Sequence, residues 1–356
     1  MLRSALLLAA LFLLAGCSRD PLVTRESFVF GTRVEILIYG APRDQAAAAA
    51  AEVLAEFDRL HREFHAWQPS QLTALNDDIA AGKPHIVSAE LAELLNNAQA
   101  IARQSDYLFD PGIGAEVKLW GFHDDTFKPQ LPDATALATL KTAKPSISDI
   151  VMDGMCSGRA RDKAGSGCQV VTLNRSVALD FGGYLKGVAL DRAAALLRAR
   201  GINNALVNIG GNIIALGMKG TQPWRVGIQH PRSTGPMASV ELQDGEAIGT
   251  SGDYQRYFEF GGKRYCHLID PRTASPSQNS QSVTILIPAN HPMPGMMSDA
   301  DSKPLFIAGD EWPAVARKLG LPNVLRVDAQ GKLQLTPGMK ARIKFESAAQ
   351  QATVVP

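Results

Sequence analysis

The sequence lacks several features that would assign a function by themselves. Its 356 residues carry 36 Lys and Arg against 35 Asp and Glu, a net charge of +1, which excludes nucleic acid as a partner. No apolar run reaches the ~20 residues that a membrane-spanning helix needs. Neither the Walker pattern nor G-x-G-x-x-G is present. The 46% of hydrophobic residues nevertheless predicts a well-buried globular protein.

The first residues have the order of a bacterial export signal. Arg3 precedes the apolar run Leu6–Leu14, and Leu14-Ala15-Gly16-Cys17 follows it. This last segment resembles the bacterial lipobox, in which the Cys is acylated before cleavage. We therefore expect residues 1–16 to be a signal peptide and Cys17 to be the lipidated first residue of the mature chain.

The residues after the signal bear on location and on domain organisation. Ser18, where an acidic residue could stand, favours the outer membrane, so we expect a periplasm-facing lipoprotein of the cell envelope. Residues 17–23 are interpreted as a lipidated linker and 24–345 as one functional domain. Residues 346–356 are expected to form a flexible tail.

Cysteine is scarce, with four residues in the whole chain. Cys156 and Cys168 flank a loop rich in Gly, Ser, Arg and Lys, and in an oxidising periplasm they are candidates for a disulfide. A metal site is the alternative, but no His or second Cys pair stands at zinc spacing. Cys266 lies in an apolar and aromatic run and is expected to be buried.

The hydrophobic patterns predict an α+β fold, without the regular alternation of a doubly wound parallel sheet. Helices are expected over 43–66, from the N-cap Ser88 to about Gln104, from Lys186 to Gly201, and over 312–319. Strands are expected over 28–39, 149–152, 170–173, 205–209, 212–216, 224–229, 264–269 and 283–287.

The densest functional signal is the glycine-rich segment Asp180–Asp191, which leads into a predicted helix. Glycines let backbone amides approach an anion, a helix N-terminus favours negative charge, and Lys186 can supply a positive charge. The segment is a candidate phosphate site. A simple helix-starting turn is the alternative for this segment taken alone.

Several further segments follow in order and carry a family resemblance. They are Phe30-Gly31-Thr32, Phe109–Phe122, Gly210–Ile213, Trp224–Ile228, Thr250–Phe258 and His267–Thr273. Together with the glycine-rich segment they resemble the FAD:protein FMN transferase (ApbE) family, and the likeness extends to about Gly309. The resemblance implies a bilobed, T-fold-related α+β unit that binds FAD and Mg²⁺. It also implies transfer of FMN to a Thr of an exported or membrane flavoprotein, with release of AMP.

The resemblance also implies roles for individual residues. The positions that match cofactor-contacting residues of the family are Phe30, Trp67, Leu108, Phe109, Asp110, Asp180, Lys186 and Ile269. Phe30 and Trp67 could instead be core residues, and Asp270-Pro271 beside Ile269 could be only a turn. Asp299 and Lys186 match the catalytic positions. Asp299 and the backbone at Gly183 match the metal ligands.

The chain departs from the family at the metal end. The family has a Thr where this chain has Lys303. A hydroxyl oxygen can ligate a hard cation, whereas a protonated Lys only donates hydrogen bonds. Either Lys303 occupies part of the Mg²⁺ site, or it points away and Asp301 or Ser302 supplies the missing oxygen.

Three functions therefore stay open at this point. The first is an FMN transferase that uses FAD and Mg²⁺. The second is a non-catalytic FAD-binding lipoprotein, a carrier or an accessory to electron transfer, which would tolerate Lys303. The third is an FAD pyrophosphatase, which needs the metal but no protein acceptor.

Overall fold

The computed structural model describes residues 22–124, 126, 128–153, 168–347 and 351–355. The predicted signal peptide, the lipidation residue Cys17 and the disulfide candidate Cys156 lie outside the described residues. The expected boundary between linker and domain shifts by one residue, because the first strand already begins at Val23. None of the helices in the described part of the chain is long and apolar enough to cross a membrane.

A nine-stranded sheet runs through the molecule, and neighbouring strands are antiparallel except for the last pair, which is parallel. Its strands, in spatial order, are β1 (Val23–Val29), β2 (Thr32–Ile38), β6 (Ala205–Ile209), β7 (Asn212–Leu216), β10 (Ala247–Gly252), β15 (Ser280–Ile287), β16 (Val324–Asp328), β17 (Leu333–Leu335) and β19 (Ala352–Val354). The central strand β15 is buried along its whole length.

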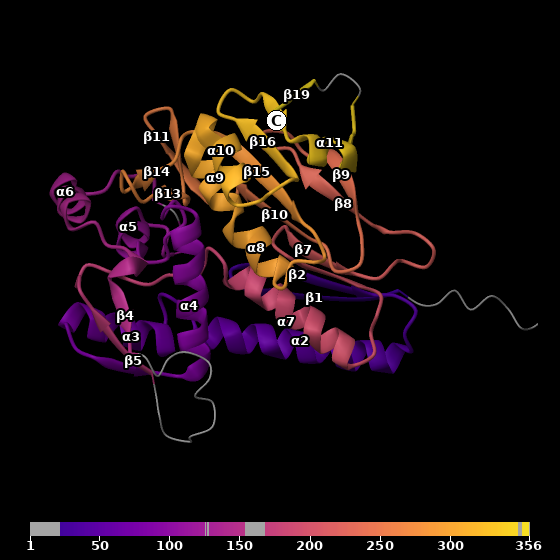
Figure 1. The fold of residues 1–356 in the computed structure, drawn as a ribbon, viewed down its shortest axis with the longest axis horizontal. Coiled ribbons are helices and arrows are strands. Elements are labelled where there is room, and N and C mark those ends of the chain that lie inside the picture. Colours follow the sequence, from indigo (N-terminus) through magenta and orange to yellow (C-terminus); the bar gives the residue numbers. More distant parts are fainter. Residues whose placement is uncertain (1–21, 125, 127, 154–167, 348–350, 356) are drawn as a thin grey trace, which may run out of the picture.

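Three helices pack against this sheet and carry or support the site described below. They are α2 (Arg43–Glu63), α7 (Leu185–Ala199) and α8 (Pro294–Ala300); α7 contacts both of the others, and in Figure 1 α2 and α7 lie at the bottom of the molecule with α8 above them. The buried positions of α2 are Ala46, Ala49, Ala50, Val53, Phe57 and Leu60, at the three- and four-residue spacing of one helix face.

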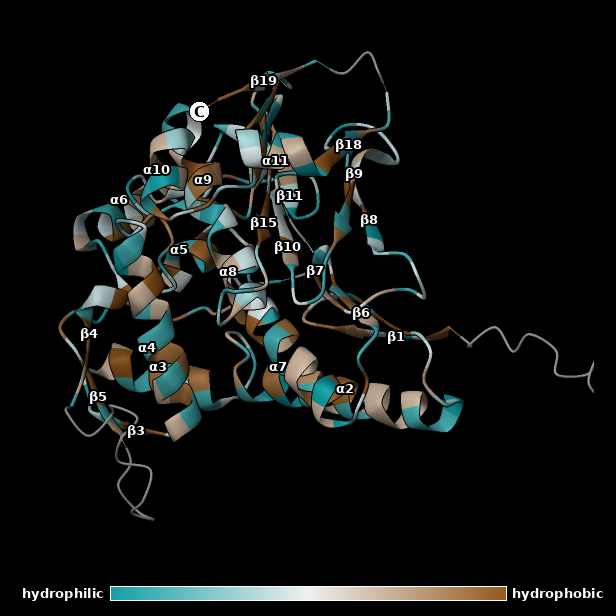
Figure 2. Ribbon diagram, turned by 45° about the vertical axis from the view of Figure 1, so that its right-hand side comes forward, coloured by the Kyte–Doolittle hydropathy of each residue, from teal (hydrophilic) through white to brown (hydrophobic). Residues whose placement is uncertain are grey.

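A helical lobe lies beside the sheet, at the left of Figure 1. It contains α3 (Gln71–Ala81), α4 (Ala89–Gln104), α5 (Gly114–Leu119), α6 (Ala134–Ala143) and the 3-10 turn η1 (Ile147–Asp149). Its small sheet has the order β3 (His85–Val87), β5 (Cys168–Thr172) and β4 (Ile150–Met152). Figure 2 shows hydrophobic residues, in brown, on α3 and α4. This lobe and the nine-stranded sheet agree with the expected bilobed α+β fold.

The remaining elements are a second small sheet, two hairpins and four helical segments. A second three-stranded sheet has the order β18 (Ile343–Phe345), β9 (Pro236–Leu242) and β8 (Trp224–Gln229). Two hairpins pair β11 (Tyr257–Phe260) with β12 (Lys263–Cys266) and β13 (Ile269–Asp270) with β14 (Ser275–Pro276). The helical segments α9 (Ser302–Ala308), η3 (Gly309–Glu311), α10 (Trp312–Lys318) and α11 (Pro337–Arg342) complete the fold.

Most of the predicted elements are confirmed at their positions. Ser88 caps α4 by accepting a hydrogen bond from the backbone N–H of Leu91 at 3.2 Å. Gly201, just after α7, has the positive φ of 72° that a helix C-terminal glycine provides. The strands 205–209, 212–216 and 224–229 have the predicted bounds.

Three expectations are wrong. The segment 28–39 is a hairpin rather than one strand, because Phe30 and Gly31 adopt positive φ of 57° and 67° and turn the chain. The segment 264–269 is divided between β12 and β13. The expected flexible tail contains β19, which pairs with β17 at the edge of the main sheet.

Candidate functional site

The glycine-rich turn before α7 is fixed by its own hydrogen bonds and by α4. The Asp180 carboxylate accepts from the backbone N–H of Gly182 at 2.8 Å. Tyr184 is fully buried and its hydroxyl donates to the carbonyl of Leu94 in α4 at 2.9 Å. Burial raises the pKa of Asp180, and the charges of Arg256 and Lys186 oppose that shift. The turn is thus held firmly against the helical lobe.

The start of α7 lies directly against α8. A Cβ placed on Gly187 would be 2.4 Å from the carbonyl oxygen of Gly295 and 2.9 Å from Cβ of Asp299, so only glycine permits this approach. Asp191 accepts from the backbone N–H groups of Gly295 and Met296 at 2.7 and 2.8 Å, which fixes the first turn of α8. As a result, α8 presents Asp299 to the glycine-rich turn.

Asp299 is the centre of a buried ionic cluster. Its side chain is 2% exposed, and its Oδ1 is 2.8 Å from the Lys303 Nζ. Its Oδ2 lies 3.7 Å from the Lys186 Nζ and accepts from the backbone N–H of Gly187 at 3.1 Å. The fold therefore brings the two residues expected to be catalytic, Asp299 and Lys186, close together. Lys303 lies beside them.

The cluster keeps its carboxylate ionised. Burial alone would raise the pKa of Asp299, but the positive charges of Lys186 and Lys303 outweigh burial and hold this pKa below its ordinary value. Burial lowers the pKa of Lys303, and the attraction of Asp299 opposes that shift. The charges of Asp299 and Lys303 thus stabilise each other, whereas Lys186 favours the charge of Asp299 and disfavours that of Lys303.

Lys303 lies over the glycine-rich turn rather than away from it. A Cβ on Gly183 would be 3.4 and 3.5 Å from its Cε and Cδ, and 3.1 Å from a ring carbon of Phe109. Its Nζ also donates to the carbonyl oxygen of Asp299 at 2.6 Å. Lys186 donates to the carbonyl oxygen of Gly182 at 3.1 Å. Gly183, Phe109 and both lysines thus meet at one place.

The oxygen atoms around Asp299 do not suit Mg²⁺ in this arrangement. Mg²⁺ requires a nearly octahedral set of oxygen ligands, and no group of three His, Cys, Asp or Glu side chains forms a metal site within the described residues. Oδ1 and the carbonyl oxygen of Asp299 both accept from Lys303, which cannot itself be a ligand. Lys303 thus lies against Asp299 rather than pointing away from it.

The other two candidates for the missing oxygen do not replace Lys303. The Ser302 hydroxyl donates to the carbonyl of Asp299 at 2.8 Å and lies 2.7 Å from the Ser251 hydroxyl. Asp301 is 1% exposed, and its Oδ1 has no hydrogen-bond partner among the residues that the structure describes. Burial raises the pKa of Asp301 to about 7, which disfavours the charged form that a cation would require.

Four of the remaining predicted cofactor residues lie in four different surroundings. Phe30 packs at the hairpin turn against α2, with its ring 6.1 Å from that of Phe57. Trp67 contacts the ring of His123 at 5.8 Å. Ile269 is buried in a cluster with Trp120, Phe122 and Phe258, and Leu108 is buried beside Cys266 and Leu268. Phe109 lies against the glycine-rich turn, beside Gly183 and with its ring 6.0 Å from that of Tyr184.

Asp110 has a structural use that the sequence did not reveal. Its Oδ1 accepts from the backbone N–H groups of Gly112 and Ile147, both at 2.8 Å. It is 7% exposed, and burial raises its pKa. The carboxylate therefore fixes the turn before α5 to η1.

Two residues of the site region were not assigned from the sequence, although they lie in segments that carry the resemblance. Arg256 donates to the carbonyl of Phe122 at 3.0 Å, and its own carbonyl accepts from the backbone N–H of His267. Burial lowers the pKa of His267 to about 3, and the charges of Arg256, Lys186 and Lys303 act in the same direction. A neutral His267 and the cationic Arg256 thus lie in the same positively charged region as Lys186 and Lys303.

The cysteines give one confirmed expectation and one that stays a prediction. Cys266 is 1% exposed and burial raises its thiol pKa to about 12, as expected for a buried apolar side chain. Cys168 begins β5 and is buried. Because Cys156 lies outside the described residues, its pairing with Cys168 is still a prediction.

The chain is similar to proteins of known family. The family model described as "ApbE family" matches residues 30–325. A protein named FAD:protein FMN transferase from Rhodobacter capsulatus is 40% identical over 348 residues, which cover 96% of this chain and 63% of the relative. The chain thus spans less than two thirds of that relative's length. A protein of the same name from Treponema pallidum is 30% identical, covering 94% of this chain and 92% of the relative.

Solved structures have the same fold. The ApbE protein of Thermotoga maritima superposes with a TM-score of 0.79 at 27% identity, covering 90% of this chain and 99% of that chain. The structure described as flavin transferase ApbE from Vibrio cholerae gives a TM-score of 0.75 at 24% identity, covering 91% of this chain and 99% of that chain. The second likeness concerns the fold alone.

Proposed function

Because the chain belongs to the ApbE family, we propose that it is an FAD:protein FMN transferase, an enzyme that moves FMN from FAD to a protein. The proposal is supported by the match of residues 30–325 and by two relatives with this name, each at least 30% identical. FAD is accordingly the substrate, and a flavoprotein is the acceptor.

The proposed reaction is an exchange of phosphate bonds. The hydroxyl oxygen of an acceptor Thr attacks the phosphorus on the FMN side of FAD. The pyrophosphate bond breaks, AMP leaves with the bridging oxygen, and the Thr hydroxyl proton is released. The product is a phosphoester between FMN and the acceptor. Charge on the phosphate oxygens must be neutralised during such a transfer.

The observation that carries the proposal is the pair of ammonium groups beside the glycine-rich turn. Lys186 and Lys303 lie on opposite oxygens of Asp299, at the first turn of α7. Positive charges and free backbone N–H groups at a helix start attract phosphate. In the proposed reaction, Asp299 holds the lysines in place, and the lysines neutralise the pyrophosphate.

The apolar residues of the site region would receive the ring systems of FAD. Phe109 packs on the turn at Gly183, so a ring placed beside it would lie next to the phosphates. Phe30, Trp67, Leu108 and Ile269 are the other positions that the family resemblance assigns to cofactor contact. Aromatic stacking of a ring contributes about 1 kcal/mol.

A non-catalytic FAD-binding protein is the second candidate, and the contact of Lys303 with Asp299 favours it. The family resemblance implies Mg²⁺, but Lys303 donates hydrogen bonds to two oxygens of Asp299, its Oδ1 and its main-chain carbonyl oxygen. The transferase proposal therefore assigns the charge of the cation position to Lys303 and involves no metal-dependent step.

We further propose that the enzyme acts at the cell envelope on an exported or membrane flavoprotein. The support is the lipobox-like segment Leu14-Ala15-Gly16-Cys17 after an apolar run. Lipid on Cys17 would hold the protein on the periplasmic face of the outer membrane. Incorporation of labelled palmitate, lost in Cys17→Ala, tests this location.

The transferase proposal is tested by incubating the full chain, purified in detergent, with FAD and an acceptor that contains a target Thr. We expect flavin fluorescence on the acceptor in a denaturing gel, an equal amount of AMP, and no label on an acceptor with Thr→Val. AMP without a labelled acceptor would instead identify a pyrophosphatase. FAD binding with neither product would identify a carrier.

A further inference from the structure

Lys303 meets Asp299 because of their spacing. Asp301 joins α8 to α9 with helical dihedral angles, φ −76° and ψ −12°, so the helical path continues from one to the other. Residues four apart on a helix lie on the same face. Lys303 accordingly reaches both Oδ1 and the carbonyl oxygen of Asp299, at 2.8 and 2.6 Å.

This ion pair is an internal feature and not a surface contact. The two side chains are 13% and 2% exposed. The aliphatic part of Lys303 lies against Gly183, where a larger residue would press on it. The carbonyl oxygen that Lys303 contacts also accepts from the Ser302 hydroxyl at 2.8 Å. Packing and hydrogen bonds thus fix the ammonium at one position beside the turn.

The charges of the cluster leave little reason for a divalent ion. Asp299 already has Lys303 at one oxygen and Lys186 near the other. A metal ion at Asp299 would have to displace the Lys303 ammonium and would then be repelled by two nearby positive charges. An ammonium at the same place neutralises phosphate oxygens without any added ion, because its three N–H donors can serve both carboxylate and phosphate.

We infer that the Lys303 ammonium is a built-in cation at the phosphate end of this site, which enables the chain to bind FAD without a divalent metal ion. The inference rests on the proposed function, because its ligand is the pyrophosphate of the same dinucleotide. It goes beyond that function by assigning to one side chain the role that the family resemblance gives to Mg²⁺.

The experiment measures metal and FAD binding separately, using the full chain in detergent. Mn²⁺ is the metal probe, followed by its electron paramagnetic resonance, and FAD binding is followed by flavin fluorescence. The wild-type chain should bind no Mn²⁺ at this site and should have the same FAD affinity in EDTA and in Mg²⁺. Lys303→Thr should gain Mn²⁺ binding, and its FAD affinity should be at least about tenfold weaker in EDTA than in Mg²⁺.

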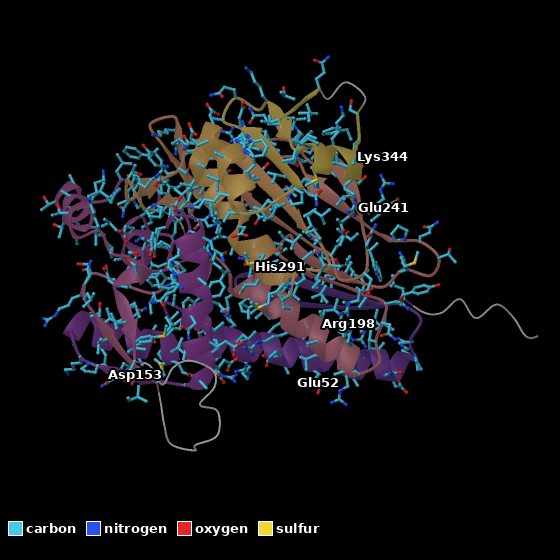
Figure 3. All side chains as sticks on the ribbon, in the orientation of Figure 1. Glu52, Asp153, Arg198, Glu241, His291 and Lys344 are labelled. Carbon is cyan, nitrogen blue, oxygen red and sulfur yellow. The ribbon has the colours of Figure 1, made fainter. Side chains whose placement is uncertain are left out.

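Two further variants are the controls. Lys303→Arg keeps a cation and should still bind FAD equally with and without Mg²⁺, which preserves the test if the Thr variant does not fold. Lys344→Thr makes the same exchange at an exposed lysine of β18, labelled in Figure 3 on the side of the molecule away from α8 and α9. It should behave like the wild type.

Two results would contradict the assignment of the cation role to Lys303. Stoichiometric Mn²⁺ binding by the wild-type chain, together with an FAD affinity that falls in EDTA, would overturn the inference. So would a lack of FAD binding under both conditions. Metal-independent FAD binding without transfer to any acceptor would support the inference and contradict only the proposed function.

Discussion

The two sides of the phosphate site differ in how they relate to the family pattern. On one side, Gly182–Lys186 keeps the glycine-rich turn, and its lysine reaches the carbonyl of Gly182. On the other side, Asp299–Lys303 has the carboxylate that the resemblance implies, but an ammonium stands where the resemblance implies a hydroxyl, and it binds that carboxylate. In our proposal, the position of a positive charge is retained while its source changes from a metal ion to the Lys303 ammonium. The predictions below test each side of this comparison.

The largest expected effect follows from removing the carboxylate that both sides share. Asp299→Asn would leave the Lys303 ammonium, which is 13% exposed, and the partly exposed Lys186 ammonium without this anion. Breaking a buried charge cluster in this way costs about 4 kcal/mol of unfolding free energy. Denaturant unfolding measures the loss, and we expect FMN transfer to disappear as well.

The matched control for this change is a surface pair. Asp244 and Arg198 form an ion pair at 3.0 Å with both side chains more than half exposed. Asp244→Asn should change stability by less than about 0.5 kcal/mol, because exposed pairs contribute little. If the two Asn variants were equally stable, Asp299 would not hold the two lysines as we describe.

A somewhat smaller effect is expected where the two sides touch. Gly187→Ala places a Cβ 2.4 Å from the carbonyl oxygen of Gly295, so α7 and α8 must separate. Overpacking of this kind costs about 3 kcal/mol. Gly183→Ala, whose nearest contacts are 3.1 to 3.5 Å, should cost less but should weaken FAD binding by displacing Phe109 and Lys303. A greater loss of stability in Gly183→Ala would contradict this order.

These glycines also indicate how far the sequence alone could predict the site. The glycine-rich segment was identified as a phosphate candidate because local spacing determines a turn followed by a helix. The contact of Gly187 with Gly295 could not be predicted, since it joins residues more than one hundred positions apart. The orientation of Lys303 was left open for a similar reason, because the link between α8 and α9 decides it.

The same distinction between local signals and long-range contacts applies to the prediction of the fold. The strands 205–209 and 212–216 were predicted with their observed bounds, because alternation and the Gly210-Gly211 turn are local signals. The pairing of β19 with β17 is a long-range contact at a sheet edge, so the segment that contains it was mistaken for a flexible tail. The hairpin at Phe30 was missed because a non-glycine residue adopts the positive φ there.

The last prediction concerns the pH dependence of stability and distinguishes two neighbouring carboxyl groups, those of Asp299 and Asp301. Burial raises the pKa of Asp301 to about 7, whereas the unfolded value is about 3.9. The folded chain then binds this proton more tightly, so the contribution of Asp301 to stability is most favourable below about pH 4 and falls as the pH rises toward 7. Asp301→Asn should remove that slope and make the chain more stable than the wild type at pH 8.

Unfolding measured from pH 4 to pH 8 tests this expectation. The wild type and Asp301→Asn should converge at the acid end and diverge above neutrality. Parallel curves would show that Asp301 does not contribute to the pH dependence. Asp299 should add no slope above about pH 6, because its carboxyl is ionised there in both the folded and the unfolded state.

The most direct measurement is the mass of a Thr-containing acceptor after incubation with FAD and the full chain, with all divalent ions removed by EDTA. The account predicts that the wild-type enzyme adds one FMN group and releases AMP under these conditions, whereas Lys303→Thr does so only when Mg²⁺ is restored. An acceptor that the wild type modifies only in the presence of Mg²⁺ would contradict the assignment of the cation position to Lys303.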